Sequence, residues 1–578
     1  MMAGAHVNRL IVAAALGMTV VVTPRAQTTA PAGSPQAPIA PATLAPRVGV
    51  AEPPLSLTLS DAIRMTLEQS NDVAIAKLDV DAARQNVRAL EGIFDPRVAP
   101  TFSYERRVTA NTSAIGGATE GRLEQTEIAG GATFSGRTPR GGGRFTVDFS
   151  SSRLESSNQF ARLNPQFPSA LAATYTQPLF RGRAIDNDRR NILIARRTVD
   201  LTDAQLTQVV MDQLTLVEQA YWDLAFAVRN LEVLTSALEQ ARAQVASNER
   251  QAKQGALAPI DVVEAQTQVA RFQEAVASGQ QTLTEAENRL KRLMLPNRSA
   301  AAWNKPIVPA ELADRTPPAL GVEDAVKLAL GRRPELRALE STRAQNAVDR
   351  AYYKDQTKPQ VNVIGGYTVA GLSGDPLSSS SEPPVGGDDS DSALLARLNE
   401  LSMLAGLTPL PTPPPSTGTA VPPLFVGGYG TSLSNLLGRR FPTAVVQLQM
   451  DLPLRNQTAR ANLKRAEISA TQIERRRQAL EQAIESDVRD SLQAVRSSQQ
   501  RLDAASAARR YALEQYESER RRFDSGISTV FLVLERQTAL VTAQASELRA
   551  RADLNQAIAE LERAVGGTLE LHGIKLQS

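Results

Sequence analysis

The spacing of apolar residues predicts long helices in both halves of the chain. Apolar positions alternate in steps of three and four, which is the repeat of a coiled-coil seam. The first helical run, roughly residues 201–253, would be about 80 Å long at ~1.5 Å per residue. The seam positions are Leu214, Val217, Tyr221, Leu224, Val228, Leu231, Thr235 and Leu238 in the first half, and Val488, Leu492, Val495 and Leu502 in the second.

A second face of these helices carries small residues. They are Ala220, Ala227, Ala241, Ala505, Ala508 and Ala512. A helix with apolar or small side chains on two sides can hold a neighbour on each side. The pattern therefore favours a closed ring of helices over an isolated pair.

Each long helical pattern reverses once at a glycine. The stretches "QAKQGALAPIDVVEAQ" and "RRFDSGISTVFLVLERQ" carry a helical pattern up to a glycine and restart it at once. Gly255 and Gly526, the two glycines, are 271 residues apart. Because glycine takes a positive φ at little cost, it commonly ends helices. We predict two helical hairpins with these glycines at their tips.

Alternating apolar and polar residues predict strands between the helical blocks. Four such segments lie within residues 97–178, and two more lie at 359–372 and 441–452. Alternation over about ten residues is what a strand that crosses a membrane needs. A soluble sheet shows the same alternation, so the strands alone leave both interpretations open. Residues 373–440 are rich in Gly, Pro and Ser and predict an exposed loop, with a short helix at "SALLARLNELSML".

The two halves of the chain are copies of one plan. "DAIRMTLEQSNDVAIAKLDV" begins 263 residues before "DAVKLALGRRPELRALESTR", and the same offset pairs Pro96 with Pro359. Each half reads as helix, strands and long helical hairpin, which indicates an internal duplication. The first repeat is expected over 55–310, with strands at 97–178 and a hairpin at 185–295. The second is expected over 311–570, with a helix at 320–356, strands at 359–372 and 441–452, loop 373–440 and a hairpin at 456–566.

The N-terminus carries an export signal. Arg9 precedes an apolar run that is too short to span a bilayer and fits a secretory signal peptide. We expect the signal peptide at 1–26, with cleavage as late as residue 32. A Pro/Ala-rich leader follows at 27–54. Export removes nucleic acid as a partner.

Composition excludes several kinds of chemistry. The net charge is only +3, and there is no cysteine, so disulfides and thiolate metal sites are excluded. The two histidines, His6 and His572, lie near the termini. The sequence contains no P-loop, GxSxG or zinc motif. We therefore expect no catalytic residues, no cofactor and no metal.

Together, the export signal, the duplicated plan, "QPLFRG" at 177–182 and the two glycine reversals resemble the TolC-like outer-membrane efflux proteins. The resemblance covers roughly residues 55–568. It implies an α+β membrane protein whose long antiparallel coiled-coil helices form a trimeric α-helical barrel. Each protomer would add four strands to a shared transmembrane β-barrel. The first half offers four strands where the family needs two, so either 121–153 forms an extra hairpin beyond the barrel or one strand assignment is wrong.

The resemblance also implies a function. It is a passive channel in the outer membrane that extends into the periplasm and serves tripartite efflux or type I secretion. The implied partners are two further copies of the chain, a periplasmic adaptor (membrane fusion) protein, an inner-membrane pump of the RND, ABC or MFS type, and outer-membrane lipid. The alternative is a soluble periplasmic coiled-coil scaffold or adaptor. An adaptor carries one helical hairpin, whereas this chain predicts two.

The family places its gate and adaptor contacts at the two reversals. By matched position, the resemblance implies that Asp261 takes part in the closing network at the tip and that Glu535 is one of the acids that narrow the pore and favour cations. The alternative for Asp261 is a first-turn acid favoured by the helix dipole, and the alternative for Glu535 is a pair with Arg521 or Arg536 on a solvated face. Other positions depart from the family: Leu532 replaces an acid, Phe523 a tyrosine and Ser528 an arginine, which implies a less polar closing network. The residues implied in the tip turns and in adaptor docking are Gly255, Ala256, Leu257, Gly526 and Ile527.

Overall fold

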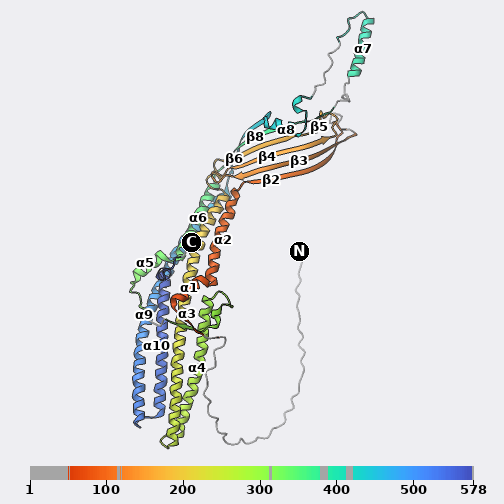
Figure 1. Cartoon of the computed structure of the whole chain (residues 1–578). Coiled ribbons are helices and arrows are strands. Elements are labelled where there is room, and N and C mark those ends of the chain that lie inside the picture. The colour runs from red at the N-terminus through yellow and green to blue at the C-terminus, as the bar shows by residue number, and fades with distance from the viewer. Residues whose placement is uncertain are drawn as a thin grey trace, which may run out of the picture. The chain divides into compact units, whose positions relative to one another are not determined.

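The computed structural model describes residues 50, 53–112, 117–118, 120–310, 315–377, 388–411 and 421–575. The expected signal peptide and most of the expected leader lie outside these residues. Figure 1 shows the arrangement of the elements, a sheet joined to long paired helices. None of the helices in the described part of the chain combines the length and the apolar character that crossing a lipid bilayer requires.

Two helical hairpins of nearly equal dimensions dominate the fold. The first joins α3 (Asn187–Lys253) to α4 (Pro259–Met294), and the second joins α9 (Gln457–Asp524) to α10 (Val530–Val565). At ~1.5 Å per residue, the 67 residues of α3 are about 100 Å long. The shorter arms α4 and α10 both have 36 residues, so the duplication preserves the hairpin length.

The predicted seams form the helical cores. Leu214, Val217, Tyr221 and Leu224 of α3 are fully buried among residues of α1, α2 and α4. Val488 of α9 is also fully buried and belongs to a second core with α5 and α10. The small residues behave differently in the two halves. Those of α3 are buried, whereas Ala508 of α9 is exposed because that face has no neighbour within the chain.

Each repeat opens with two helices, where the sequence predicted one. Residues 59–94 form α1 (Leu59–Gln69), α2 (Asn71–Glu91) and a short 3₁₀ turn, η1 (Gly92–Phe94). Residues 320–356 form α5 (Val322–Arg332) and α6 (Pro334–Gln356). The break in the second repeat lies at Arg333, because a residue before proline avoids the helical region. Ser70, 263 residues earlier, has the same extended backbone.

Six long strands form one antiparallel sheet. They are β2 (Arg97–Ala110), β3 (Arg122–Arg137), β4 (Arg144–Ser156), β6 (Ser169–Pro178), β8 (Gln360–Gly371) and β10 (Phe441–Asp451). Their order is β10-β8-β6-β4-β3-β2, and the short strands β5 (Leu163–Gln166) and β9 (Gly374–Pro376) lie off this path. The sheet of one chain therefore has six long strands, where the resemblance implied four strands per protomer in the barrel. The segment 121–153 lies inside the sheet and not beyond it, because β3 pairs with β2 and β4 pairs with β6 along most of their lengths.

Several small elements complete the fold. Strands β1 (Leu55–Leu57) and β7 (Ile307–Pro309) form a separate two-stranded parallel sheet, and the phenol of Tyr221 donates a hydrogen bond to the carbonyl of Leu57 at 3.2 Å. The segment 373–440 holds α7 (Asp388–Leu404), η4 (Pro423–Phe425) and α8 (Tyr429–Leu437). The remaining short elements are η3 (Ala301–Asn304) and α11 (Thr568–Leu571).

Candidate functional site

Both hairpin tips are built by the same helix-ending motif. At the end of α3, the amide of Ala256 donates to the carbonyl of Gln251 at 2.9 Å, and Gly255 donates to Ala252 at 3.0 Å. The end of α9 repeats this pattern, since Ile527 donates to Arg522 at 2.8 Å. These bonds define a Schellman motif, which needs a left-handed residue at the turn.

Glycine is required at these turns by backbone angle alone. Gly255 has a φ of 72° and Gly526 a φ of 75°. A Cβ added to either residue would meet nothing within 4 Å. A left-handed conformation costs an L-residue roughly 1–2 kcal/mol. The sequence-based placement of the reversals at these glycines therefore has a local physical cause.

Asp261 closes the turn of the first hairpin. It lies in the first turn of α4, where its carboxylate accepts a hydrogen bond from the amide of Ala258 at 3.2 Å. A carboxylate at this position also interacts favourably with the helix dipole. The buried side chain of Asn248 accepts a 2.7 Å hydrogen bond from Gln244 across one turn of α3. Asp261 therefore has a local structural role at the tip.

The corresponding side chains of the second hairpin are mostly apolar or locally paired. Phe523 packs against a small core of Ala265, Val530 and Leu534, which joins the ends of the two hairpins. Ser528 donates to the carboxylate of Glu519 within its own hairpin. Leu532 is half-buried, and Glu535 is exposed on α10. No hydrogen bond or ion pair between Asp261 and Glu535 is present among the described residues.

Farther from the tips than this core, a hydrogen bond also links the two hairpins. Gln268 of α4, which is only 5% exposed, donates to the hydroxyl of Thr538 on α10 at 2.8 Å. The predicted adaptor residues lie at the open end: Gly255, Ala256, Gly526 and Ile527 are exposed, and Leu257 is half-buried. Exposed apolar side chains surround them, namely Ile260, Val263 and Phe531.

The sheet has one apolar and one polar face. The register places Val98 opposite Phe134, Phe134 opposite Val147, and Phe149 opposite Leu171. Side chains alternate between faces along a strand, so the partners share one face. This apolar face continues to the far edge through Tyr175, Val363, Tyr367, Val446, Leu448 and Met450. The opposite face carries mainly Thr, Ser, Gln and charged residues.

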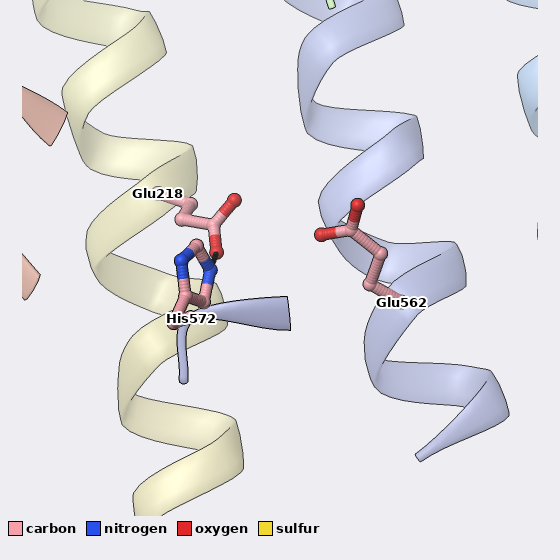
Figure 2. A group of neighbouring side chains, drawn as sticks. All are labelled: Glu218, Glu562 and His572. Carbon is pink, nitrogen blue, oxygen red and sulfur yellow. Dashed lines mark hydrogen bonds and ion pairs between the residues drawn. The ribbon is translucent and has the colours of Figure 1, made fainter. Parts of the chain in front are cut away.

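An ion-pair cluster that the sequence did not predict ties the repeats together. Arg315 bonds Glu218 of α3 at 2.8 Å and Glu562 of α10 at 2.6 Å. His572 lies 2.8 Å from the other oxygen of Glu218. Figure 2 shows the imidazole against Glu218, with Glu562 facing them from the neighbouring helix. Glu218 is only 1% exposed, and a charge inside a buried helix face is the one sequence signal that such a cluster exists.

The donor set of this cluster does not fit a metal ion. Glu218, Glu562 and His572 offer ligand atoms within 4.8 Å of one another. However, the guanidinium of Arg315 already bonds both carboxylates and supplies the positive charge that a cation would bring. Burial raises the pKa of Glu562, and Arg315 partly offsets that effect. We therefore assign the cluster as a structural ion-pair network.

A sheet with one apolar face, joined to duplicated helical hairpins, defines the class of TolC-like outer-membrane channels. Solved structures share this fold. The outer membrane protein VceC from Vibrio cholerae matches with a TM-score of 0.56 and 15% identity, over 88% of this chain and 96% of that one. The Campylobacter jejuni outer membrane channel CmeC matches with a TM-score of 0.57 and 14% identity, over 88% and 86%. The outer membrane channel MtrE from Neisseria gonorrhoeae matches with a TM-score of 0.53 and 16% identity, over 88% and 89%.

Sequence comparison gives the family. The outer membrane efflux protein family matches residues 144–294 and 424–567, just over half of the 578 residues. No curated protein matches the sequence. The chain belongs to the outer membrane efflux protein family. It is the outer-membrane channel of a tripartite efflux system, extends into the periplasm, and is not an enzyme.

We expect Gly526→Ala to destabilise the tip of the second hairpin. A methyl group at a φ of 75° costs about 1–2 kcal/mol, so amides 520–535 should exchange with solvent roughly 5- to 30-fold faster. Hydrogen exchange followed by mass spectrometry measures this directly. Gly331→Ala is the control, because Gly331 lies in α5 with open space around it and gains helix propensity. Equal effects of the two substitutions would contradict the assigned role of the backbone angle.

We expect Arg315→Gln to destabilise the protein by about 3–5 kcal/mol, because it leaves two largely buried carboxylates without their shared cation. Urea titration of the detergent-solubilised protein, followed by circular dichroism, measures the loss. Arg64→Gln is the control. It removes an exposed ion pair, in which the side chain of Arg64 is 68% exposed and that of Asp61 is 41% exposed, and should cost less than about 1 kcal/mol. A loss no larger than that of the control would show that the cluster carries little stability.

Proposed function

We propose that three copies of this chain assemble into one conduit that receives substrate from an inner-membrane pump through a periplasmic adaptor. The open sheet edges support the trimer. β2 and β10 end the sheet, each with one paired neighbour only, and every residue of both strands is exposed. Unpaired backbone groups are very costly in hydrocarbon, so the edges need partners of complementary strand direction. Copies of the same chain offer them.

The exposed apolar ends of the two hairpins are the observation that carries the adaptor contact. Ile260 is 62% exposed, Ile527 is 71% exposed and Phe531 is 59% exposed. Apolar patches of this kind on an otherwise polar helical surface mark protein interfaces. The shorter arms of the two hairpins both have 36 residues, which supports a partner that contacts both tips. The pump can be of the RND, ABC or MFS type, and type I secretion uses the same architecture.

The same tips would form the gate of the conduit. Glu535 is exposed on α10, and Asp261 lies in the first turn of α4. In a threefold assembly each acid occurs three times around the axis. A ring of carboxylates at a constriction favours cations over anions. The apolar packing of Phe523, more than polar bonds, would hold the closed state.

Ile527→Asp should disrupt efflux without disrupting the channel. A charge at this exposed apolar position opposes burial against an adaptor, whereas it costs the isolated tip little. We expect intracellular accumulation of a fluorescent efflux substrate to rise toward that of cells lacking the channel. The amount of heat-modifiable trimer in outer-membrane extracts should stay unchanged. Leu398→Asp in α7 is the control, because Leu398 is also an exposed apolar residue. Normal efflux by the Ile527 variant would refute docking at this tip, and a purely monomeric protein would refute the trimer.

Glu535→Gln should reduce cation selectivity. Removal of three negative charges from a narrow ring lowers the local attraction for cations. We expect a smaller reversal potential in a KCl gradient across a planar bilayer, and weaker block by trivalent cations. Glu68→Gln, an exposed acid in α1, should leave both quantities unchanged. An unchanged reversal potential for the Glu535 variant would place the selectivity elsewhere.

A further inference from the structure

The internal duplication shows which strands of the sheet are additional. Val98 of β2 corresponds to Val361 of β8 by the 263-residue offset between the repeats, so these two strands are equivalent. β6 and β10 are equivalent as well, since each precedes the long helix of its repeat. In the second repeat β8 and β10 are direct neighbours, whereas in the first repeat β3 and β4 lie between β2 and β6. The hairpin β3–β4 is therefore an insertion into the first repeat.

The inserted strands are long enough to cross the membrane. β3 has 16 residues and β4 has 13, whereas a tilted strand needs about 9–11 to cross the hydrocarbon core. By comparison, β6 and β10, which correspond to each other in the two repeats, have 10 and 11 residues. In length, the inserted strands are therefore as able to cross the membrane as the other long strands of the sheet.

The insertion also continues both faces of the sheet. On the apolar face, the rings of Phe134 and Phe145 lie 5.5 Å apart and bridge β3 and β4. Tyr175 of β6 lies opposite Phe145 and extends the apolar band across the boundary of the insertion. On the polar face, the hydroxyl of Thr133 donates to the carboxylate of Asp148 at 2.6 Å. The inserted hairpin thus has one face suited to lipid and one suited to water.

The turn of the insertion is anchored to the helical part of the chain. Gln177, at the end of β6, donates to the carbonyl of Gly141 in this turn at 2.7 Å. Arg137, at the end of β3, forms an ion pair with Asp188 in the first turn of α3. Together with the ladders to β2 and β6, these bonds fix the hairpin along both sides and at one end. Extrusion of the hairpin from the sheet would break all of them.

We propose that the β3–β4 hairpin widens the shared barrel, so that each protomer contributes six strands and the trimer closes a barrel of eighteen. This inference rests on the trimer proposed above. The occupant of the open edge of β2 is β10 of a second copy, because the outermost strands of a six-stranded antiparallel sheet run in opposite directions. With strands about 4.8 Å apart and tilted by about 40°, eighteen strands give a backbone diameter of about 36 Å and twelve give about 24 Å.

The consequence is a mouth in the outer membrane that admits larger solutes. The insertion enlarges the wall of the barrel but adds nothing to the helical hairpins, whose lengths match between repeats. The periplasmic tip would still control entry, while the backbone diameter of the exit would be about 1.5 times that of a twelve-stranded barrel.

A reconstruction by electron cryo-microscopy of the full-length protein in lipid nanodiscs tests the strand count. We expect eighteen strands around a threefold axis, with β3 and β4 in the wall. A trimer with twelve strands, from which the β3–β4 hairpin is excluded, would overturn this inference and leave the proposed function intact. A protein that does not form trimers would overturn both.

Pore width gives a second test. Deletion of residues 113–166 removes β3, β4 and β5 and leaves residues 111, 112, 167 and 168 to connect β2 directly to β6. Graded polyethylene glycols added on the extracellular side measure the largest polymer that enters the barrel and lowers the single-channel conductance. We expect the limiting diameter to fall by at least about one third, because the backbone diameter falls in proportion to the strand number while the layer of side chains inside keeps its thickness. Deletion of residues 388–411, which include α7, is the control and should leave the limit unchanged. An equal limiting diameter for the wild type and the 113–166 deletion would refute the proposal. If the deletion variant does not assemble, the strand count from the reconstruction tests the proposal instead.

Discussion

Backbone hydrogen bonding at the two open edges of the sheet is the constraint on which the architecture depends. Inside hydrocarbon, water cannot satisfy the free amides and carbonyls of β2 and β10. Each edge therefore requires another strand, and among the residues that the structure describes the strand order leaves none available within one chain. Assembly is thus a condition for insertion into the membrane. In the proposed trimer, chains joined at the sheet would also bring their long helices around one axis.

The helical part is held together by two separate kinds of interaction. Each repeat has its own apolar core, one around Leu214 and one around Val488. Between the repeats the link is more polar: Arg315 joins α3 to α10 near one end of the shorter arms, and Gln268 joins α4 to α10 nearer the tips. The buried cation Arg333 bonds Asp487 of α9 at 2.8 Å and holds the break between α5 and α6 in place. Charged pairs of this kind are directional, so they set the alignment of helices that apolar seams would allow to slide.

How much the sequence predicted depended on how local the signal was. The hairpins and their tips were predictable because heptad spacing and a glycine with positive φ act within a few residues. The strands were recognisable from alternation, but their number in the sheet was not, because pairing of β3 with β2 and of β4 with β6 is a tertiary property. The cluster around Arg315 joins residues up to 354 positions apart, from Glu218 to His572, and no pattern connects them. The breaks at Ser70 and Arg333 were both absent from the predicted helices. The proline after Arg333 was a local signal against a continuous helix, whereas Ser70 gives no such signal, because a serine does not exclude helix on either side.

The inserted hairpin changes the symmetry of the molecule from one end to the other. In the helical part, the two repeats present arms of the same length, so three chains would approximate a sixfold arrangement. In the sheet, the first repeat supplies four long strands and the second supplies two, so only a threefold arrangement remains. The ion pair between Arg137 and Asp188 lies where the sheet joins the helical part. A solute leaving the conduit would pass from surroundings that repeat every 60° to surroundings that repeat every 120°.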